Sequence, residues 1–312
     1  MEDINKKKNN HLTKKITIIT GATGSGKSAY AVELAKKING VIINADSMQI
    51  YKQIPIISAQ PSHTETQDVG HYLYGFVDIF DTKNVYSVGK YLNDLKNTIT
   101  QIKANNPEKT PIIVGGTMLY IDAIINGLNI IPEIKSDVKD YVKNKYSNKN
   151  AEQIFQDLKK LDEKYANIVD KNNPQRVIRG IEVKLSTGKS ITDFWNNQEE
   201  KSIFNDYEIQ KFVIDVPRNL LYDKINNRFD KMLELGALEE VFTVYKYCHE
   251  NNIDYTKLPK AIGLKEFFDF FDKKMSLETA ISGAKQHSRN YAKRQMTWFR
   301  NRFTDFQKIF LT

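Results

Sequence analysis

A glycine-rich loop that directly follows a short apolar run constrains the fold of this chain most. Residues 21–28 read Gly-Ala-Thr-Gly-Ser-Gly-Lys-Ser, and the apolar run before them spans 16–20. A G-x-x-x-x-G-K-[ST] loop between a buried strand and a helix surrounds phosphate groups with backbone N–H groups. The sequence therefore predicts a diphosphate-bearing ligand here, followed by a helix over 28–37. The residues that would hold it are Gly21, Ala22, Thr23, Gly24, Ser25, Gly26, Lys27 and Ser28, with Mg²⁺ on the Ser28 hydroxyl.

Short, nearly all-apolar segments and helical patterns alternate in the first part of the chain. This alternation is typical of βαβ crossovers with a parallel sheet covered on both faces. We predict an α/β fold, a P-loop doubly wound parallel sheet with a helical insertion domain. The expected strands are 15–20, 41–44, 111–114 and 212–214, and the helices between the first three are 28–37 and 88–104.

Strand-like segments are missing between residues 130 and 204, where helical patterns cover 137–145, 151–161 and 162–169. A further helix over 174–187 has Asn173 as its cap, Pro174 in its first turn and Gly188 just past its end. We therefore predict three segments. They are a first part of the P-loop core at 12–129, a helical insertion at 130–204, and a second part of the core with basic C-terminal helices at 205–312.

Composition limits the class of protein only in part. The net charge of +8 permits a polyanionic partner, but a lysine-rich composition alone also explains it. The single cysteine, Cys248, excludes an intramolecular disulfide and a cysteine-based zinc site. The polar stretch 1–15 and the short apolar run behind it predict neither a signal peptide nor a membrane span. We expect a cytoplasmic protein with no membrane partner, and no feature points to an obligate protein partner.

Asp46 follows the second expected strand. Strands of a doubly wound sheet end at the ligand crevice, so Asp46 is expected beside the phosphate loop. Three roles remain open for it: a Mg²⁺ ligand, a general base on an acceptor, or the cap of the next turn. Gln49 carries a donor and an acceptor, which suits the edge of an adenine.

The third expected strand ends in Gly115-Gly116-Thr117, where a phosphotransferase often carries an acidic metal ligand. Two glycines favour close backbone approach to a bulky or apolar substrate, although a tight turn without a role is the alternative.

Arginines on two expected helices suggest anionic partners. Arg176 and Arg179 lie near a helix N-terminus, where the macrodipole opposes positive charge; an anion or a surface pair with Glu182 would compensate. On the expected helix 222–240, which Gly236 ends, Arg228 could reach a diphosphate. Pairing with Asp230 or Asp223 is the other interpretation.

The segment 285–302 carries six Lys or Arg residues and no acid, with Tyr291, Gln295 and Trp298 between them. Cations for phosphates that alternate with aromatics and amides for bases suit a single-stranded RNA loop. The alternative is a solvated basic face with a core-packed tryptophan.

Together these segments resemble the tRNA dimethylallyltransferase (isopentenyltransferase) family, bacterial type. The resemblance runs in order from residue 16 to about 302. The matching segments are GATGSGKS, NADSMQIYK, PIIVGGTMLYIDAI, NPQRVIRGIEVKLSTGKS, NNRFDKMLELGALEEV, KAIGLKE and KQHSRNYAKRQMTWFR. The resemblance implies transfer of a dimethylallyl group from dimethylallyl diphosphate to N6 of the adenosine just 3′ of the tRNA anticodon.

The resemblance also implies roles for individual residues. The phosphate loop would hold the donor's diphosphate with Mg²⁺ at Ser28, Asp46 would be the general base, and Thr23 and Arg228 would steady the leaving charge. Lys139 stands where the family commonly has an arginine that touches tRNA. The residues implied to contact the tRNA anticodon stem-loop are Asp46, Ser47, Met48, Gln49, Thr117, Lys139, Gln175, Arg176, Val177, Ile178, Arg179, Arg289, Arg294 and Arg300.

The chain departs from the family at His71-Tyr72, Gln60 and Lys260, where two histidines, a lysine and a glutamine are usual. Three other functions stay open on residues alone: a P-loop kinase of a nucleotide or small metabolite, prenyl transfer to free AMP or ADP, and a non-catalytic RNA binder. A kinase or an AMP-specific enzyme has no need for the basic C-terminal segment, and a pure binder leaves Asp46 without a task.

Overall fold

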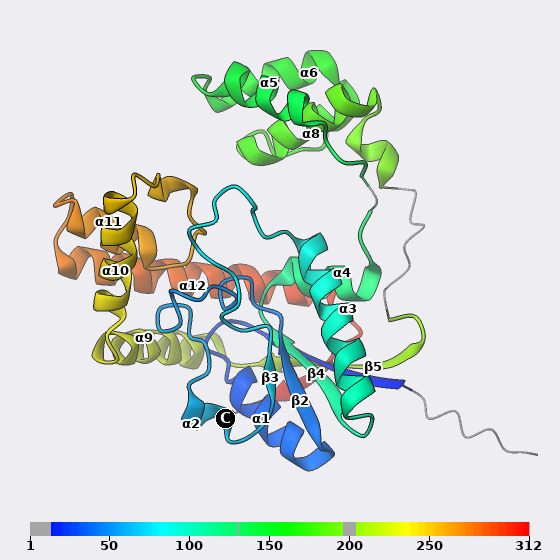
Figure 1. The fold of residues 1–312 in the computed structure, drawn as a ribbon, viewed down its shortest axis with the longest axis vertical. Helices are drawn as coiled ribbons and strands as arrows, with labels where there is room; N and C mark the ends of the chain where they lie inside the picture. Colours follow the sequence, from blue (N-terminus) through cyan, green and yellow to red (C-terminus); the bar gives the residue numbers. More distant parts are fainter. Residues whose placement is uncertain (1–13, 130, 196–203, 312) are drawn as a thin grey trace, which may run out of the picture. The chain divides into compact units, whose positions relative to one another are not determined.

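The protein is described by a computed structural model that covers residues 14–129, 131–195 and 204–311. The chain divides into two compact units, of which the first comprises Met1–Ile125 and Phe204–Thr312 and the second Asn126–Ile203 (Figure 1). Within the described ranges, no helix has the length and apolar character needed to cross a membrane.

A parallel sheet forms the centre of the first unit, as predicted. Its strands follow the order β3-β2-β4-β1-β5-β6, and every neighbouring pair is parallel. The inner strands are runs of Ile and Val because both sheet faces are covered. The strands are β1 (Lys14–Gly21), β2 (Gly40–Asn44), β3 (His71–Tyr72), β4 (Thr110–Gly115), β5 (Tyr207–Asp215) and β6 (Gln307–Phe310).

The three loops that carry the candidate site meet at one edge of the sheet. In register, Thr20 of β1 lies opposite Gly115 of β4, and Asn44 of β2 lies opposite Val114 of β4. The carboxyl ends of these strands are therefore level. This register brings together the phosphate loop, the segment that begins at Ala45, and the turn after β4.

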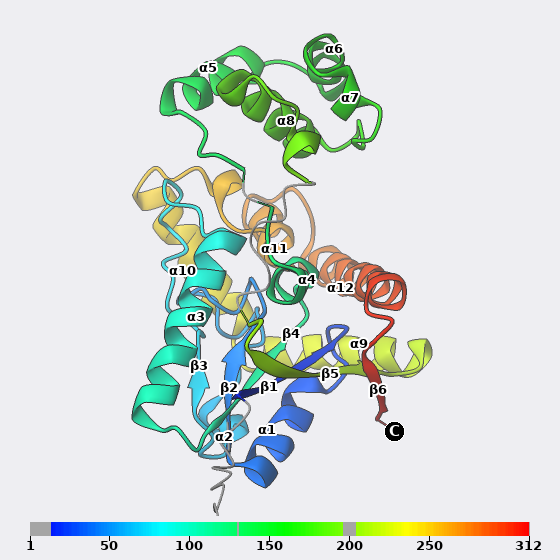
Figure 2. The same cartoon turned by 90° about the vertical axis from the view of Figure 1, so that its right-hand side faces the viewer.

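Helices cover both faces of the sheet. Figure 2 shows α1 (Lys27–Ile38) and α3 (Val88–Asn105) on opposite sides of the strands. Ala31 and Ala35 of α1 and Ile225 of α9 (Arg218–Glu234) belong to one buried hydrophobic cluster with residues of β1, β2 and β4. This unit also contains the shorter helical segments α2 (His63–Thr66), α4 (Met118–Asn126) and η2 (Tyr255–Lys257).

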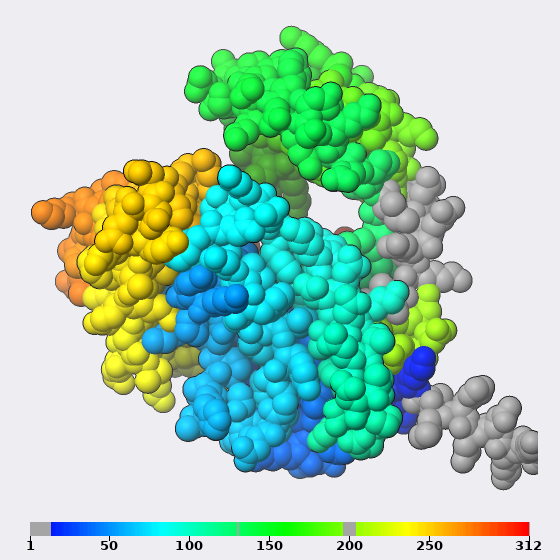
Figure 3. All heavy atoms as spheres, viewed as in Figure 1, coloured from blue at the N-terminus to red at the C-terminus, as the bar shows by residue number. Residues whose placement is uncertain are grey.

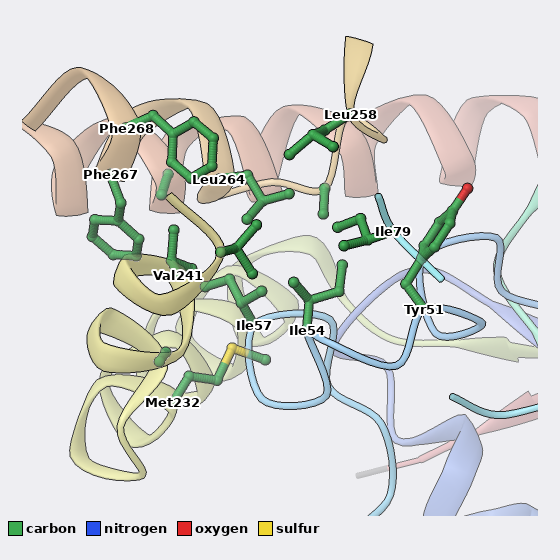
Figure 4. Close-up of a cluster of buried hydrophobic side chains, with 14 of the residues drawn as sticks. Tyr51, Ile54, Ile57, Ile79, Met232, Val241, Leu258, Leu264, Phe267 and Phe268 are labelled. Carbon is green, nitrogen blue, oxygen red and sulfur yellow. The ribbon is translucent and has the colours of Figure 1, made fainter. Parts of the chain in front are cut away.

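A second hydrophobic cluster fixes the long loop between β2 and β3. Figure 4 shows Ile54 and Ile57 of this loop packed toward Val241 and Leu264. The cluster is completed by α9, α10 (Ala237–Glu250), α11 (Leu264–Phe271) and α12 (Leu277–Arg302). In the space-filling view the blue and cyan loop and the yellow helices form one continuous surface (Figure 3). The loop is thus held by a core of its own rather than by the sheet.

The second unit is all-helical in its described residues and has a separate core. Its helices are α5 (Ser136–Tyr146), α6 (Ala151–Leu161), α7 (Glu163–Ala166), α8 (Pro174–Thr187) and the 3₁₀ helix η1 (Ile191–Phe194). Leu158, Val177 and Ile181 are fully buried where α6 and α8 pack. As predicted, the Asn173 side chain caps α8, Pro174 opens it and Gly188 ends it in the left-handed conformation, at φ 73°.

The structure differs from the sequence prediction in a few elements. The predicted helix 222–240 is two helices, because Gly236 at φ 96° breaks α9 from α10. The predicted helix 162–169 is the single turn α7. Strands β3 and β6 were not predicted, since two and four residues with polar edge positions carry little periodic signal.

Candidate active site

The phosphate loop has the backbone shape that an anion cradle requires. Gly24 and Gly26 adopt φ of 79° and 88°, and a Cβ on Gly24 would lie 2.8 Å from Cγ1 of Ile225. The N–H of Ser25 closes the turn on the carbonyl of Ala22 at 3.1 Å. The buried hydroxyl of Ser25 has no hydrogen-bond partner in the described part of the chain. These features fit a diphosphate, whose oxygens would accept from such groups.

Lys27 sits at the start of α1 and is strongly desolvated. Burial lowers the pKa of its ammonium to about 8, with the nearby Arg228 acting in the same direction and Asp46 opposing it. A desolvated cation without a full counter-charge favours the binding of an anion, because the anion replaces the favourable interaction with water that the ammonium lost on burial.

Arg228 reaches from α9 to the phosphate loop. Its Nη2 donates a hydrogen bond to Oγ1 of Thr23 at 2.6 Å, and burial lowers its pKa while Asp46 raises it. Of the two roles that the sequence left open, pairing with a neighbouring carboxylate on its own helix is wrong. Asp230 instead pairs with Lys285 at 2.6 Å, and within the described ranges Asp223 forms no ion pair.

Asp46 is oriented by its own backbone and by Asn44. Its N–H donates to Oδ1 of Asn44 at 2.8 Å, and its Oδ1 accepts the N–H of Met48 at 2.9 Å. One carboxylate oxygen therefore caps the turn, as one sequence interpretation held. Asp46 also raises the pKa of Lys27, Arg228 and Tyr291, so its charge is felt on both sides of the crevice.

Of these groups, Thr23, Arg228 and Asp46 line one cavity of about 300 Å³. Polar residues of its lining include Thr23, Asp46, Ser47, Arg228 and Arg294. The remaining lining is mainly apolar, with Met48, Ile57, Ile225, Phe229, Met232, Ala261 and Ile262. A lining that combines charged and apolar groups suits an amphiphilic ligand that carries a phosphate head and a hydrocarbon tail.

The two glycines where β4 ends are required by the protein's own chain. A Cβ on Gly115 would lie 2.1 Å from the carbonyl of Ala45, and one on Gly116 would lie 2.5 Å from Nε2 of Gln295. The close approach predicted from sequence is therefore internal. Thr117 follows directly, and its Oγ1 accepts the N–H of Ser47 at 2.8 Å.

Two glutamines expected to face bases are engaged within the protein. Gln295 is 0% exposed, with its amide bonded to Thr23 and Gly116, so the expectation that it faces RNA is wrong. Nε2 of Gln49 donates to the carbonyls of Ala59 at 2.6 Å and Ser58 at 3.2 Å, so its donor is already used. The spacing of residues shows on which face of a helix a glutamine lies, but it does not show which residue distant in the sequence its side chain bonds.

The basic residues of α12 differ in their surroundings. Arg294 lines the cavity and lies 5.7 Å over the ring of Tyr291, and Arg300 is exposed near the end of the helix. Arg289 donates hydrogen bonds to Oδ1 of Asn226 and to Oε1 of Gln286. Trp298 packs edge-on against Phe303 but is only half-buried, so the alternative of a core-packed tryptophan holds in part. A wider hollow of about 740 Å³ is lined by Met118, Asn290, Lys293, Arg294, Thr297, Trp298, Asn301 and Arg302.

The remaining predicted contacts belong to the second unit. Lys139 on α5 and both Gln175 and Arg176 on α8 are exposed, whereas Ile178 is half-buried. Arg179 pairs with Glu182 at 3.6 Å, the compensation that the sequence left open. Val177 is fully buried in the core, so its predicted contact with RNA is wrong for its side chain.

Sequence reasoning missed the apolar wall of the cavity. Phe229 and Met232 lie on α9 within one turn of Arg228, where helical spacing alone indicates ordinary core. Lys260 also lines the cavity and carries a positive charge there. These lining residues are recognised as part of a site only because the phosphate loop and Asp46 lie beside them.

The fold and the loop define an α/β P-loop protein with an all-helical second unit. The model of the IPP transferase family matches residues 49–302. The chain is 39% identical over 290 residues to the tRNA dimethylallyltransferase of Bartonella quintana (strain Toulouse), which covers 93% of this chain and 95% of that one. The chain therefore belongs to the IPP transferase family, as its motifs predicted.

Solved structures agree with this assignment. The tRNA isopentenylpyrophosphate transferase of Bacillus halodurans superposes with a TM-score of 0.65 at 32% identity, over 95% of this chain and 90% of that one. A eukaryotic dimethylallyltransferase described as acting on tRNA gives a TM-score of 0.79 at 29% identity, over 95% and 74%.

Proposed function

We propose that this protein transfers a dimethylallyl group from dimethylallyl diphosphate to N6 of the adenosine just 3′ of the anticodon in tRNA. The observation that carries the proposal is the cavity whose lining combines Asp46 and Arg228 with apolar side chains, with Lys27 close enough for both charges to act on its pKa. Relatives named tRNA dimethylallyltransferase support the choice of substrates. We expect the enzyme to act in the cytoplasm, as a monomer and without an obligate protein partner.

The donor's diphosphate would occupy the phosphate loop. Gly24 and Gly26 shape the loop, Lys27 supplies a charge and the Arg228–Thr23 pair closes one side. The hydrocarbon would lie against Phe229 and Met232. As the carbon–oxygen bond breaks, negative charge grows on the diphosphate, and these donors stabilise it more than they stabilise the ground state.

Mg²⁺ would bind at the exposed Ser28 hydroxyl and at the diphosphate oxygens. No group of three or more His, Cys, Asp or Glu in the described part of the chain could hold a metal by itself. Mg²⁺ commonly keeps several waters and binds through substrate phosphates, so a single hydroxyl fits this ion. When bound, it would neutralise charge on the leaving diphosphate.

Asp46 would take the proton from the exocyclic amine. That amine is a poor nucleophile and must lose a proton as the new carbon–nitrogen bond forms, so a carboxylate within reach is required. The proton goes to Asp46, the alkyl group to N6, and the bonding electrons of the broken carbon–oxygen bond leave with the diphosphate. The base must leave the RNA stack first, at a cost of a few kcal/mol that contacts to the protein offset.

The accessible residues among those predicted from sequence would hold the RNA. We expect Ser47, Met48 and Thr117 near the extruded base. In each unit taken by itself, we expect exposed polar and basic residues to contact the RNA, namely Arg294 and Arg300 in the first and Lys139, Gln175 and Arg176 in the second. Positively charged side chains serve this purpose because phosphates dominate affinity for nucleic acids.

Acceptor choice is the test of this function. The protein is incubated with labelled dimethylallyl diphosphate and either an anticodon stem-loop or AMP. We expect label in the stem-loop and none in AMP. Label in AMP alone would show that the acceptor is a free nucleotide and would contradict the proposal.

A further inference from the structure

The side chain of Gln295 joins two loops that the proposed function assigns to different substrates. Its Oε1 accepts the N–H of Thr23 in the phosphate loop at 2.8 Å. Its Nε2 donates to the carbonyl of Gly116, in the turn after β4, at 2.7 Å. The side chain is 0% exposed, so water does not compete for either bond.

Both partners of Gln295 are backbone groups, and this fixes the orientation of the amide. A backbone N–H only donates and a carbonyl only accepts, so a single side chain with one donor and one acceptor is required. Glutamate would place a carboxylate oxygen against the Gly116 carbonyl. Methionine, of similar shape, would leave both backbone groups unpaired, at a cost typical of buried unsatisfied groups.

The bonds of Gln295 continue into both halves of the site. On the donor side, Oγ1 of Thr23 accepts the hydrogen bond from Arg228 at 2.6 Å. On the acceptor side, Thr117 follows Gly116 and holds the N–H of Ser47 at 2.8 Å, next to Asp46. Tyr291, one turn before Gln295 on α12, lies beside Thr117 and Gln295 as well.

We propose that Gln295 is a positioning residue that sets the separation between the donor's diphosphate and the loop that carries the general base. The inference rests on the proposed function. Because the N–H of Thr23 is committed to Gln295, this amide orients the loop and leaves phosphate binding to the other loop groups. A misplacement of about 1 Å between reacting groups costs about 100-fold in rate, which is the scale expected for losing this link.

Gln295→Met is the first test, with Gln101→Met, on the exposed face of α3, as the matched control. We expect kcat to fall between about 10-fold and 100-fold in Gln295→Met, with KM for the donor changed by less than about threefold, because Lys27 and the other loop groups still bind the diphosphate. The control keeps wild-type kcat. If kcat per folded molecule stays within about twofold of wild type, Gln295 has a structural role only and the proposal is wrong.

A double-mutant cycle tests the same link from its other end. The Cβ of Gly116→Ala would lie 2.5 Å from Nε2 of Gln295, so this variant should lower kcat by displacing the amide. In a Gln295→Ala background the displaced group is absent and the contact of 3.2 Å to the carbonyl oxygen of Gly21 remains, so Gly116→Ala should then have a smaller effect on kcat. Equal effects in both backgrounds would show that the two residues act independently and would overturn the inference.

Amide hydrogen exchange separates this inference from the proposed function. In Gln295→Met, and not in Gln101→Met, the peptide that contains Thr23 should exchange faster, because its N–H has lost its acceptor. If wild type transfers no label to any RNA, the proposed function is wrong. The comparison of exchange at Thr23 between the two variants would still test whether Gln295 joins the two loops. Unchanged exchange at Thr23 in Gln295→Met would contradict the link itself.

Discussion

At the scale of single residues, the site depends on charges that the fold has taken out of water. Lys27 shows this most clearly, since burial lowers the pKa of its ammonium to about 8 while Asp46 partly restores it. Arg228 is desolvated in the same region and bonded to Thr23. Such groups bind an anion strongly because binding replaces lost solvation.

The lowered pKa of Lys27 predicts a pH dependence for donor capture. Below pH about 8 the ammonium of the free enzyme is charged, and as pH rises through this value the charge and its attraction for diphosphate are lost. We therefore expect kcat/KM for the donor to fall above pH about 8, by about tenfold per pH unit.

Lys27→Arg provides the comparison for this measurement, because a guanidinium stays charged over the same range. The descending limb should be absent in that variant even if its rate is lower. A limb in the native protein centred near the ordinary lysine value of 10.5 would show that Lys27 is not desolvated as described.

The sequence predicted some of these residues and missed others for a physical reason. The phosphate loop and Asp46 follow from local order, since a strand that ends in a glycine-rich turn leaves few alternatives. Gln295 could not be predicted, because its partners Thr23 and Gly116 are 272 and 179 residues away. An amide on a basic helix has the same local pattern whether it faces RNA or a buried carbonyl.

At the scale of elements, α10 holds the loop that borders the cavity. Both oxygens of Glu240 accept backbone N–H groups, from Ile56 at 2.8 Å and Ile57 at 2.9 Å. Ile57 and the residue that follows it, Ser58, line the cavity. The loop shape therefore depends on a helix that itself contributes no residue to the lining.

Glu240→Gln should weaken this attachment. The amide nitrogen would face one of the two backbone donors, and an unpaired donor costs about 1–3 kcal/mol. We expect a comparable loss in the free energy of unfolding, measured by urea denaturation, together with a higher KM for the donor. Glu239→Gln, exposed on the same helix, is the control. Equal stability of the two variants would refute a clamping role for Glu240.

The exposed cations of α12 should govern affinity for RNA. Replacing Arg294 and Arg300 with glutamine should lower the slope of log K against log salt by about 1 for each phosphate contact removed. The measurement is stem-loop binding at several salt concentrations. The matched control is Lys246→Gln, on the exposed face of α10. An unchanged slope would show that the two arginines make no contact with RNA phosphates.

At the scale of the whole molecule, the chain combines a doubly wound sheet with a separate helical unit that has its own core. The alternation of apolar runs and helical patterns predicted the sheet well, because a buried parallel strand leaves a plain apolar signature. Strands β3 and β6 escaped prediction because edge strands are short and polar. The cavity wall escaped because Phe229 and Met232 resemble core until the fold aligns them with Asp46.

The central claim is that one carboxylate, Asp46, removes the proton while the phosphate loop holds the departing diphosphate. A single-turnover reaction of labelled dimethylallyl diphosphate with an anticodon stem-loop, run with wild type and Asp46→Asn, tests it most directly. We predict that Asp46→Asn binds the stem-loop as wild type does but transfers label about 100-fold to 10,000-fold more slowly, the range typical of a lost general base. Transfer by Asp46→Asn at the wild-type rate would contradict the account.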